Sequence, residues 1–99
     1  MEYQKTGSQL RVRLIRDFNL FTVRRMAPLA DDVDAVHIDL SGAKIVDSEA
    51  VRLLYQMVRS GKRVTLAHPP EIMREVIDVL GLGEVLDIDA MTTSEKGTQ

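Results

Sequence analysis

The residues best suited to chemistry stand at the start of the clearest amphipathic helix in the sequence. Asp47 and Ser48 open this helix, and Glu49 follows them. The first N–H groups of a helix have no partner within it, so an Asp or Ser side chain at this point caps the helix. A phosphate on Ser48 would add negative charge where the helix dipole favours it. The pattern therefore predicts a surface contact point whose charge can change while the helix stays folded.

Ser48 is the candidate phosphorylation site, and Ser41 in the preceding turn is the second choice. Ser41 and Gly42 can also help to shape a binding surface, although a plain turn is the simpler interpretation of these two residues. Arg52 follows Glu49 by three positions, a spacing at which opposite charges pair on a helix surface. The predicted partner-binding residues are Ser41, Gly42, Asp47, Ser48, Glu49 and Arg52.

The histidines and the remaining acidic residues do not suggest catalysis. His37 alternates with apolar residues in a predicted strand, which favours a hydrogen-bonded core or rim residue, and His68 precedes two prolines at a strand end. The acidic turn at residues 31–34 lacks the glycine and the number of ligands that a calcium loop needs. The sequence contains no glycine-rich motif of the kind that cradles phosphates. We therefore predict no enzyme activity, no metal site and no cofactor.

The size and composition are those of one ordinary globular domain. The 99 residues are 44% hydrophobic and 28% charged, and we expect a single domain over residues 1–99 with an ordered core at 8–89 and flexible ends at 1–7 and 90–99. The absence of cysteine excludes disulfides and cysteine-based metal sites. No apolar run approaches the roughly 20 residues that span a bilayer, so we expect a cytoplasmic protein without membrane insertion.

The charge pattern does not favour a nucleic acid as the partner. The net charge is −2, and the chain has only two phenylalanines and two tyrosines on which bases could stack. A strip of arginines in the first third of the chain can contact an acidic partner or a membrane-associated complex. These residues are Arg11, Arg13, Arg16, Arg24 and Arg25.

Short strands and helices are predicted to alternate along the chain. A period of two over residues 9–16 predicts a strand with one wet face, near a sheet edge. Residues 20–31 predict a short or bent helix, because Asn19 or Thr22 can cap it and Pro28 interrupts its hydrogen bonds. The other predicted elements are strands at 35–40, 62–67 and 85–88 and helices at 48–60 and 70–80.

The predicted fold is α/β, a small and mostly parallel sheet with helices packed against it, because strands that alternate with helices pair in parallel through crossovers. Ligands and partners of such sheets usually bind at the carboxyl ends of the strands. In helix 48–60 the expected inward face is Val51, Leu54, Tyr55 and Val58, widened by Leu53 and Met57. In helix 70–80 it is Ile72, Met73, Val76, Ile77 and Leu80.

Several segments carry a resemblance to a known family. They are Val-His-Ile-Asp-Leu-Ser-Gly at 36–42, Ile-Val-Asp-Ser at 45–48, the helix at 51–60, Gly-Lys-Arg-Val-Thr-Leu at 61–66 and Val-Leu-Gly-Leu at 79–82. In order and spacing, residues 36–88 resemble the STAS domain, which sulfate transporters share with anti-sigma-factor antagonists. The resemblance implies a STAS-like fold, the fold of the antagonists.

The resemblance also implies a regulatory protein–protein interaction module. In the antagonist branch, a serine after the aspartate of this loop is phosphorylated by a kinase that also acts as an anti-sigma factor, and phosphorylation releases that partner. Ser48 matches this serine and Asp47 its neighbour. The branch usually continues with small residues and a glycine, whereas here Glu49 places a fixed negative charge in the loop.

Two alternatives stay open within the same family. One is a constitutive accessory subunit that docks on a transporter ATPase through an unmodified Asp47–Ser48 loop, and Glu49 favours it. The other is a nucleotide-binding STAS domain that uses the pocket beside the loop.

Overall fold

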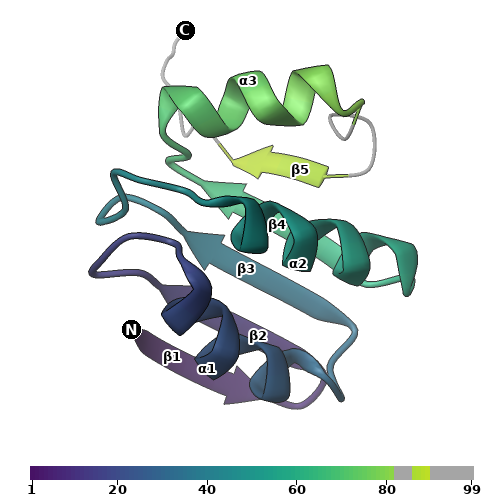
Figure 1. Ribbon diagram of the computed structural model, residues 1–99. Coiled ribbons are helices and arrows are strands. Elements are labelled where there is room, and N and C mark those ends of the chain that lie inside the picture. Colours follow the sequence, from purple (N-terminus) through teal and green to yellow (C-terminus); the bar gives the residue numbers. More distant parts are fainter. Residues whose placement is uncertain (82–85, 90–99) are drawn as a thin grey trace, which may run out of the picture.

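The chain forms one layer of sheet and one layer of helices (Figure 1). This computed structural model describes residues 1–81 and 86–89. The strands are β1 (Glu2–Thr6), β2 (Gln9–Arg13), β3 (Ala35–Asp39), β4 (Arg63–Ala67) and β5 (Leu86–Asp89), and the helices are α1 (Leu20–Ala30), α2 (Ser48–Arg59) and α3 (Glu71–Val79).

The five strands lie in the order β1-β2-β3-β4-β5. Strand β1 pairs antiparallel with β2, and the remaining neighbours pair in parallel. Parallel neighbours need a crossover connection, which α1, α2 and α3 supply in turn. This confirms the predicted α/β fold with a mostly parallel sheet. The first predicted strand, however, is one position in from the edge and ends at Arg13.

Strand β1 shows that the prediction of a flexible leader over residues 1–7 is wrong. All five of its side chains are exposed, so no apolar alternation marks it in the sequence. The strand forms because a two-residue turn at Gly7 and Ser8 returns the chain against β2. Gly7 has a φ of +59°, which glycine adopts readily and tight hairpins require. The other predicted flexible end, residues 90–99, lies outside the described residues.

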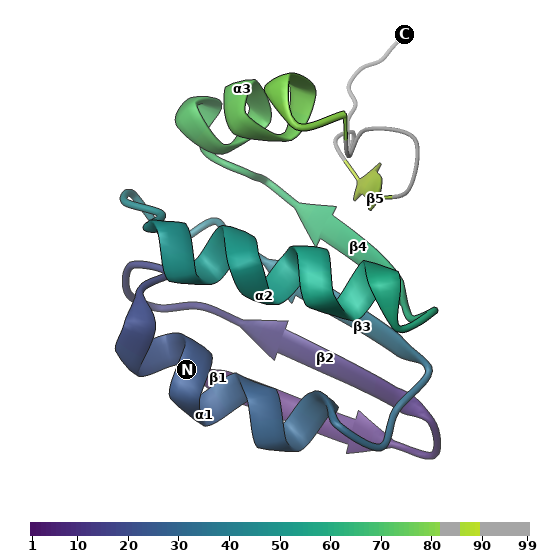
Figure 2. The same cartoon turned by 45° about the vertical axis from the view of Figure 1, so that its right-hand side comes forward.

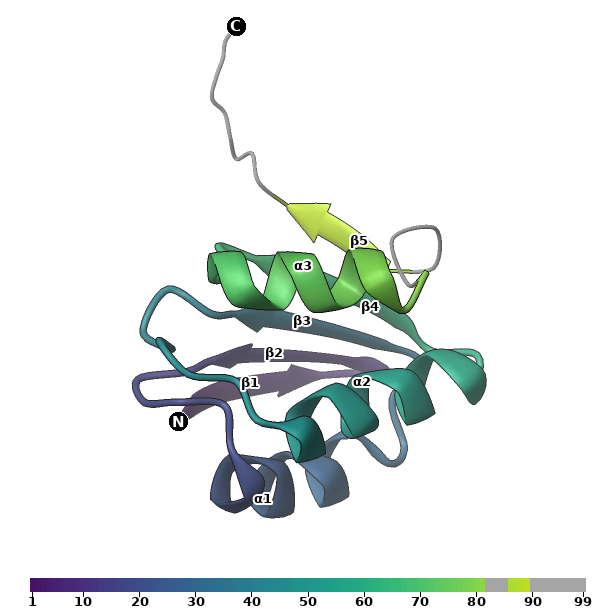
Figure 3. The ribbon, with the colours of Figure 1, turned by 45° about the horizontal axis from the view of Figure 1, so that its top comes forward.

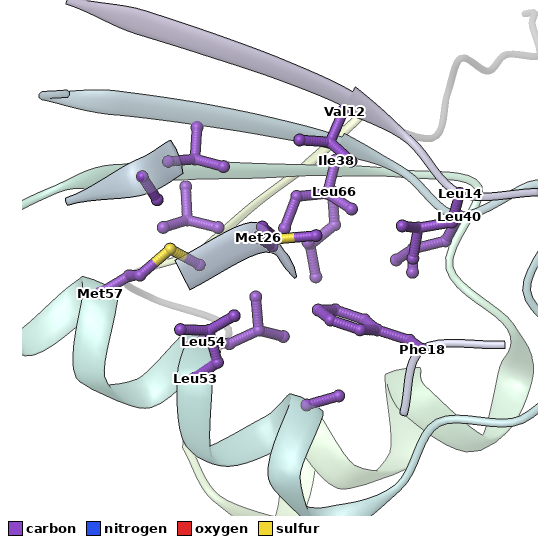
Figure 4. Packing of buried hydrophobic residues seen from close by; sticks show 14 of the residues in the cluster. Val12, Leu14, Phe18, Met26, Ile38, Leu40, Leu53, Leu54, Met57 and Leu66 are labelled. Atoms are coloured by element: carbon purple, nitrogen blue, oxygen red, sulfur yellow. The ribbon is translucent and has the colours of Figure 1, made fainter. Parts of the chain in front are cut away.

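All three helices cover the same face of the sheet, which leaves the opposite face open (Figures 2 and 3). Val12, Ile38 and Leu66 stand side by side on the covered face and are at most 2% exposed. Phe18 and Met26 fill the space between the sheet and the helices (Figure 4). Burial of each such side chain contributes roughly 1.5–3 kcal/mol, so this single core holds the domain together.

Helix α1 begins where its cap predicts. The Asn19 side chain accepts hydrogen bonds from the amides of Phe21 and Thr22 at 3.1 and 3.3 Å. The helix then continues to Ala30 with Pro28 inside it. Proline lacks the N–H that would bond the carbonyl four residues earlier, but here the loss falls in the last turn, where few further bonds depend on it.

Helix α2 ends one residue before the predicted end, and its buried face only partly matches the predicted one. The buried side chains are Ala50, Leu53, Leu54 and Met57, whereas Val51 and Val58 are half-buried and Tyr55 is exposed. Both faces have the spacing of a helical stripe, and they differ by a rotation of one residue. Contacts with α1 and β4 select the first of them, so the expected inward position of Tyr55 is wrong.

Helix α3 is likewise less buried than predicted. Met73 and Ile77 belong to the core, while Ile72 and Leu80 remain half exposed. Gly81, at a φ of +70°, ends the helix as predicted.

Candidate functional site

The candidate site is built where two loops meet beyond the carboxyl ends of β2 and β3. Phe18 and Val46 form an isolated parallel bridge outside the main strands. The Phe18 amide donates to the Ile45 carbonyl at 2.9 Å, and the Asp47 amide donates to the Phe18 carbonyl at 3.0 Å. The two loops are therefore joined by backbone hydrogen bonds just before α1 and α2 begin.

Two carboxylates hold the same loops together. One Asp17 oxygen accepts from the amides of Lys44 and Ile45 at 3.1 and 3.0 Å. Asp47 uses its two oxygens separately: one accepts from Ala50 at 3.0 Å and caps α2, and the other accepts from the first amide of α1, Leu20, at 3.0 Å. A single side chain thus fixes the starts of both helices. The predicted cap of α2 is confirmed and is Asp47.

Ser48 is the first residue of α2, and its side chain is exposed. Among the residues that the structure describes, none makes a hydrogen bond with its hydroxyl. The hydroxyl therefore stands at the positive end of the α2 dipole with room for a phosphate or a partner atom. The predicted contact point at Asp47–Ser48 therefore lies at the surface of the domain.

Glu49 and Arg52 form the predicted pair on the surface of α2. Their closest charged atoms are 4.0 Å apart, and both side chains reach solvent. Arg52 and Ser48 also border a groove of about 470 Å³ between the outer side of α2 and the end of α3. Its other lining residues are Val51, Tyr55 and Leu80. The apolar residues that α2 leaves unburied therefore line one wall beside the candidate phosphorylation site.

Ser41 and Gly42 lie in the turn after β3 and make their contacts within the domain. The Ser41 amide donates to the Asp39 carboxylate at 2.9 Å, which forms a tight turn after β3. Gly42 lies so close to the preceding loop that an added Cβ would be 2.3 Å from the Leu14 carbonyl oxygen. The simpler interpretation of this segment as a turn fits these contacts, since they are made within the domain.

Large apolar side chains are exposed around the joined loops. Phe21 is 74% exposed and follows the amide that Asp47 binds, and Ile45 is 62% exposed in the loop bonded to Phe18. Tyr55 and Leu80 in the groove are 45% and 53% exposed. A cluster of exposed apolar side chains next to one loop is typical of a protein-binding surface.

The Asp39 carboxylate gives the turn after β3 a dependence on pH. Partial burial acts to raise its pKa, but hydrogen bonds from Ser41 and the nearby charges of His68 and Arg13 outweigh it, and the pKa lies below the ordinary value of 3.8. A lowered folded pKa means that the stabilisation is complete above pH 3.8 and is lost as the pH falls through the folded pKa.

Asp39→Asn provides the test of that dependence. We expect the free energy of unfolding of the wild type, minus that of Asp39→Asn, to stay constant from pH 7 to pH 5 and to decrease below pH 3.8. Urea unfolding followed by circular dichroism at each pH measures it. A difference that does not change down to pH 3 would contradict the role given to this carboxylate.

The described part of the chain also bears on metal binding and on membrane insertion. Within residues 1–81 and 86–89, no three His, Cys, Asp or Glu side chains gather as metal ligands. Nor does any helix in those ranges have the length and hydropathy to cross a membrane. His37 lies half-buried in β3, as its strand pattern predicted, and His68 is exposed after β4.

The contributors to the site that the sequence did not indicate include Asp17, Tyr55 and Leu80. Asp17 marks only the end of a strand pattern, and its bonded amides lie 27 and 28 residues away. Tyr55 and Leu80 fit apolar stripes and were assigned to the core. Local spacing contains no signal for either role.

Comparisons with known proteins agree with this architecture. A family model described as "Mlab, STAS domain" matches residues 1–88. A search of the curated proteins found no match. Among solved structures, the Thermotoga maritima protein TM1081, described as a candidate anti-sigma factor antagonist, aligns with a TM-score of 0.71 at 15% identity, over 88% of this chain and 83% of that one.

A second solved structure is that of the Bacillus cell fate determinant SpoIIAA in its phosphorylated form. It aligns with a TM-score of 0.64 at 20% identity, over 95% of this chain and 91% of that one. At such identities the similarity to these two structures shows a shared fold. The family model covers residues 1–88, and this match shows that the chain belongs to the STAS domain family.

Proposed function

We propose that this STAS domain is a non-enzymatic protein-binding module whose partner docks over the start of α2, with Ser48 at the centre of the contact. The observation that carries the proposal is the exposed Ser48 hydroxyl at the first residue of a helix whose start Asp47 fixes to α1. A rigid surface loses little conformational freedom when a partner binds, which favours affinity.

The apolar side chains around Ser48 support a protein as the partner. Phe21 and Ile45 are exposed at the joined loops, and Val51, Tyr55 and Leu80 line the groove beside Ser48. Protein interfaces combine such an apolar centre with a charged rim, and the Glu49–Arg52 pair supplies charge at this rim.

Phosphorylation of Ser48 is the proposed control, and a serine kinase or anti-sigma-like protein is the proposed partner. A phosphate adds about −1.5 to −2 charges, which the free amides at the start of α2 can accept without unfolding. A partner packed on the same surface would meet the new charge and lose its contacts. The structural likeness to SpoIIAA, a protein whose structure is known in a phosphorylated form, supports this control.

Ser48→Asp is the direct test of the switch. In a quantitative pull-down from the cells that produce this protein, we expect one abundant partner of the wild type to fall at least tenfold on the Ser48→Asp bait and to remain on Ser48→Ala and Ser48→Asn. Circular dichroism should show unchanged folding of all four proteins. Equal recovery of every partner on the wild-type and Ser48→Asp baits would contradict the switch.

A second candidate is a constitutive accessory subunit that docks on a transporter ATPase through the same surface. The permanent negative charge of Glu49, held beside Ser48 by Arg52, favours it, because the loop is already acidic before any modification. This candidate predicts a transporter ATPase on the wild-type bait and no labelling of Ser48 by kinases that phosphorylate other STAS serines. Mass spectrometry after incubation with kinase and ATP separates the two candidates, and nucleotide titration tests a nucleotide-binding role of the groove.

A further inference from the structure

The open face of the sheet is a second surface that the proposed function leaves unused. Its side chains alternate with those of the core along β2, β3 and β4. They are Gln9, Arg11, Arg13, Ala35, His37, Asp39, Arg63 and Thr65, with Ala67 buried among them. Largely parallel sheets are usually covered on both faces, so an uncovered polar face on this sheet calls for a reason.

Two arginines stand on either side of the central strand of this face. The register pairs Arg11 with His37 and Arg63 with Ala35, so the two arginines lie diagonally across β3. Ordinary strand spacing and rise place their Cα atoms about 12 Å apart. Long side chains at this separation can converge from opposite sides on a group bound above Ala35.

A hollow occupies the space between them. It has a volume of about 160 Å³, and its side-chain lining includes Arg11, His37, Arg63 and the uncharged Gln9 and Thr65. Ala35, the first residue of β3, lines it as well, and its single methyl group leaves the face low there between longer neighbours. The hollow is large enough for a phosphate with a small organic group attached.

The positive charge of the two arginines has no partner within residues 1–81. In that range, Arg11 and Arg63 make neither an ion pair nor a hydrogen bond through their side chains. Arg13 and Arg52, in contrast, pair with Glu2 at 3.8 Å and with Glu49 at 4.0 Å. Two uncompensated guanidinium groups on opposite sides of a hollow attract an anion.

We propose that this hollow binds the phosphate group of a soluble phosphate monoester, with Arg11 and Arg63 as its two principal ligands. Each guanidinium presents N–H donors in a planar fork that suits phosphate oxygens. A phosphate monoester presents three acceptor oxygens and about −1.5 to −2 charges to the two arginines, whereas a carboxylate presents two oxygens and a single charge. Gln9 and Thr65 can donate further hydrogen bonds. The site is separate from Ser48 and does not depend on the proposed function.

The test is an NMR titration of the full ¹⁵N-labelled chain with phenyl phosphate, with benzoate as the carboxylate control and sodium chloride at matched ionic strength. We expect saturable shifts of amides in β2, β3 and β4, with no shift at Ser48, and at least tenfold weaker binding of benzoate. Shifts that sodium chloride reproduces, or benzoate binding as tight as that of phenyl phosphate, would overturn the proposal.

Variants connect the binding to the two arginines. Arg11→Gln and Arg63→Gln should each raise the dissociation constant for phenyl phosphate at least fivefold, and Arg63→Lys should weaken binding less than Arg63→Gln because it keeps the charge and loses only the fork. Arg74→Gln, which removes an exposed arginine from α3, should bind like the wild type. Retention of wild-type affinity by both glutamine variants, with their spectra showing a folded domain, would refute the site.

Discussion

Replacing Gly42 with alanine is expected to lower the free energy of unfolding by about 3 kcal/mol. The added Cβ would lie 2.3 Å from the Leu14 carbonyl oxygen, 3.0 Å from the Ile15 Cα and 3.2 Å from the Leu14 carbonyl carbon. All three are backbone atoms, so no flexible side chain can move aside. Relief of the overlap requires a shift of the loop after β2 or of the loop before α2.

Urea unfolding followed by circular dichroism measures this effect. Gly7→Ala is the matched glycine control: it has a strained positive φ but nothing within 4 Å of its added Cβ, so it should cost only about 1 kcal/mol. Ser41→Ala, in the same loop as Gly42, should change stability by less than about 0.5 kcal/mol. A Gly42→Ala variant no less stable than Gly7→Ala would show that the two loops do not approach this closely.

Replacing Asp47 with alanine should be the second most damaging change at the site, at about 2–3 kcal/mol. Its carboxylate accepts from Ala50 and Leu20, and a hydrogen bond to a charged group contributes about 1.5–3 kcal/mol after exchange with water. Because both bonds are only partly buried, their joint loss is expected at about 2–3 kcal/mol rather than at the sum of two full contributions. Loss of an ordinary helix cap costs about 1 kcal/mol. The part of the destabilisation that exceeds the cost of an ordinary cap measures the hydrogen bond between Asp47 and the Leu20 amide of α1.

Asn19→Ala provides the comparison, because Asn19 caps α1 alone and its loss should cost about 1 kcal/mol. Asp47→Asn keeps one acceptor oxygen and should fall between the wild type and Asp47→Ala. Equal costs for Asp47→Ala and Asn19→Ala would mean that Asp47 caps only α2. The same series separates folding from binding, since Ser48→Asp is expected to change binding while stability stays near that of the wild type.

Local patterns in the sequence predicted the elements that bury apolar residues. The helices at 20–31, 48–60 and 70–80 and the strand at 35–40 appear with ends that differ from the prediction by at most one residue. Strand β1 could not be found in this way. All five of its side chains are exposed, so its sequence has no alternation of apolar and polar residues. Its position follows from pairing with β2 through the turn at Gly7.

The buried face of α2 could not be predicted from the local spacing of apolar residues. The series through Ala50, Leu53 and Met57 and the series through Val51 and Tyr55 have equal helical spacing. The neighbouring helix and sheet decide which series is buried, and these neighbours come from distant parts of the chain. Tyr55 is consequently part of the groove beside Ser48, a role that its own segment does not indicate.

The sequence by itself determined the order of strands and helices after β1 and the presence of a capped helix start at Asp47–Ser48, because periodicity and capping depend on residues only a few positions apart. Only the tertiary structure decided that Asp47 also holds α1, that Gly42 must be small and that Arg11 faces Arg63 across β3. These contacts join residues separated by more than 25 positions, and their geometry depends on how the whole chain packs.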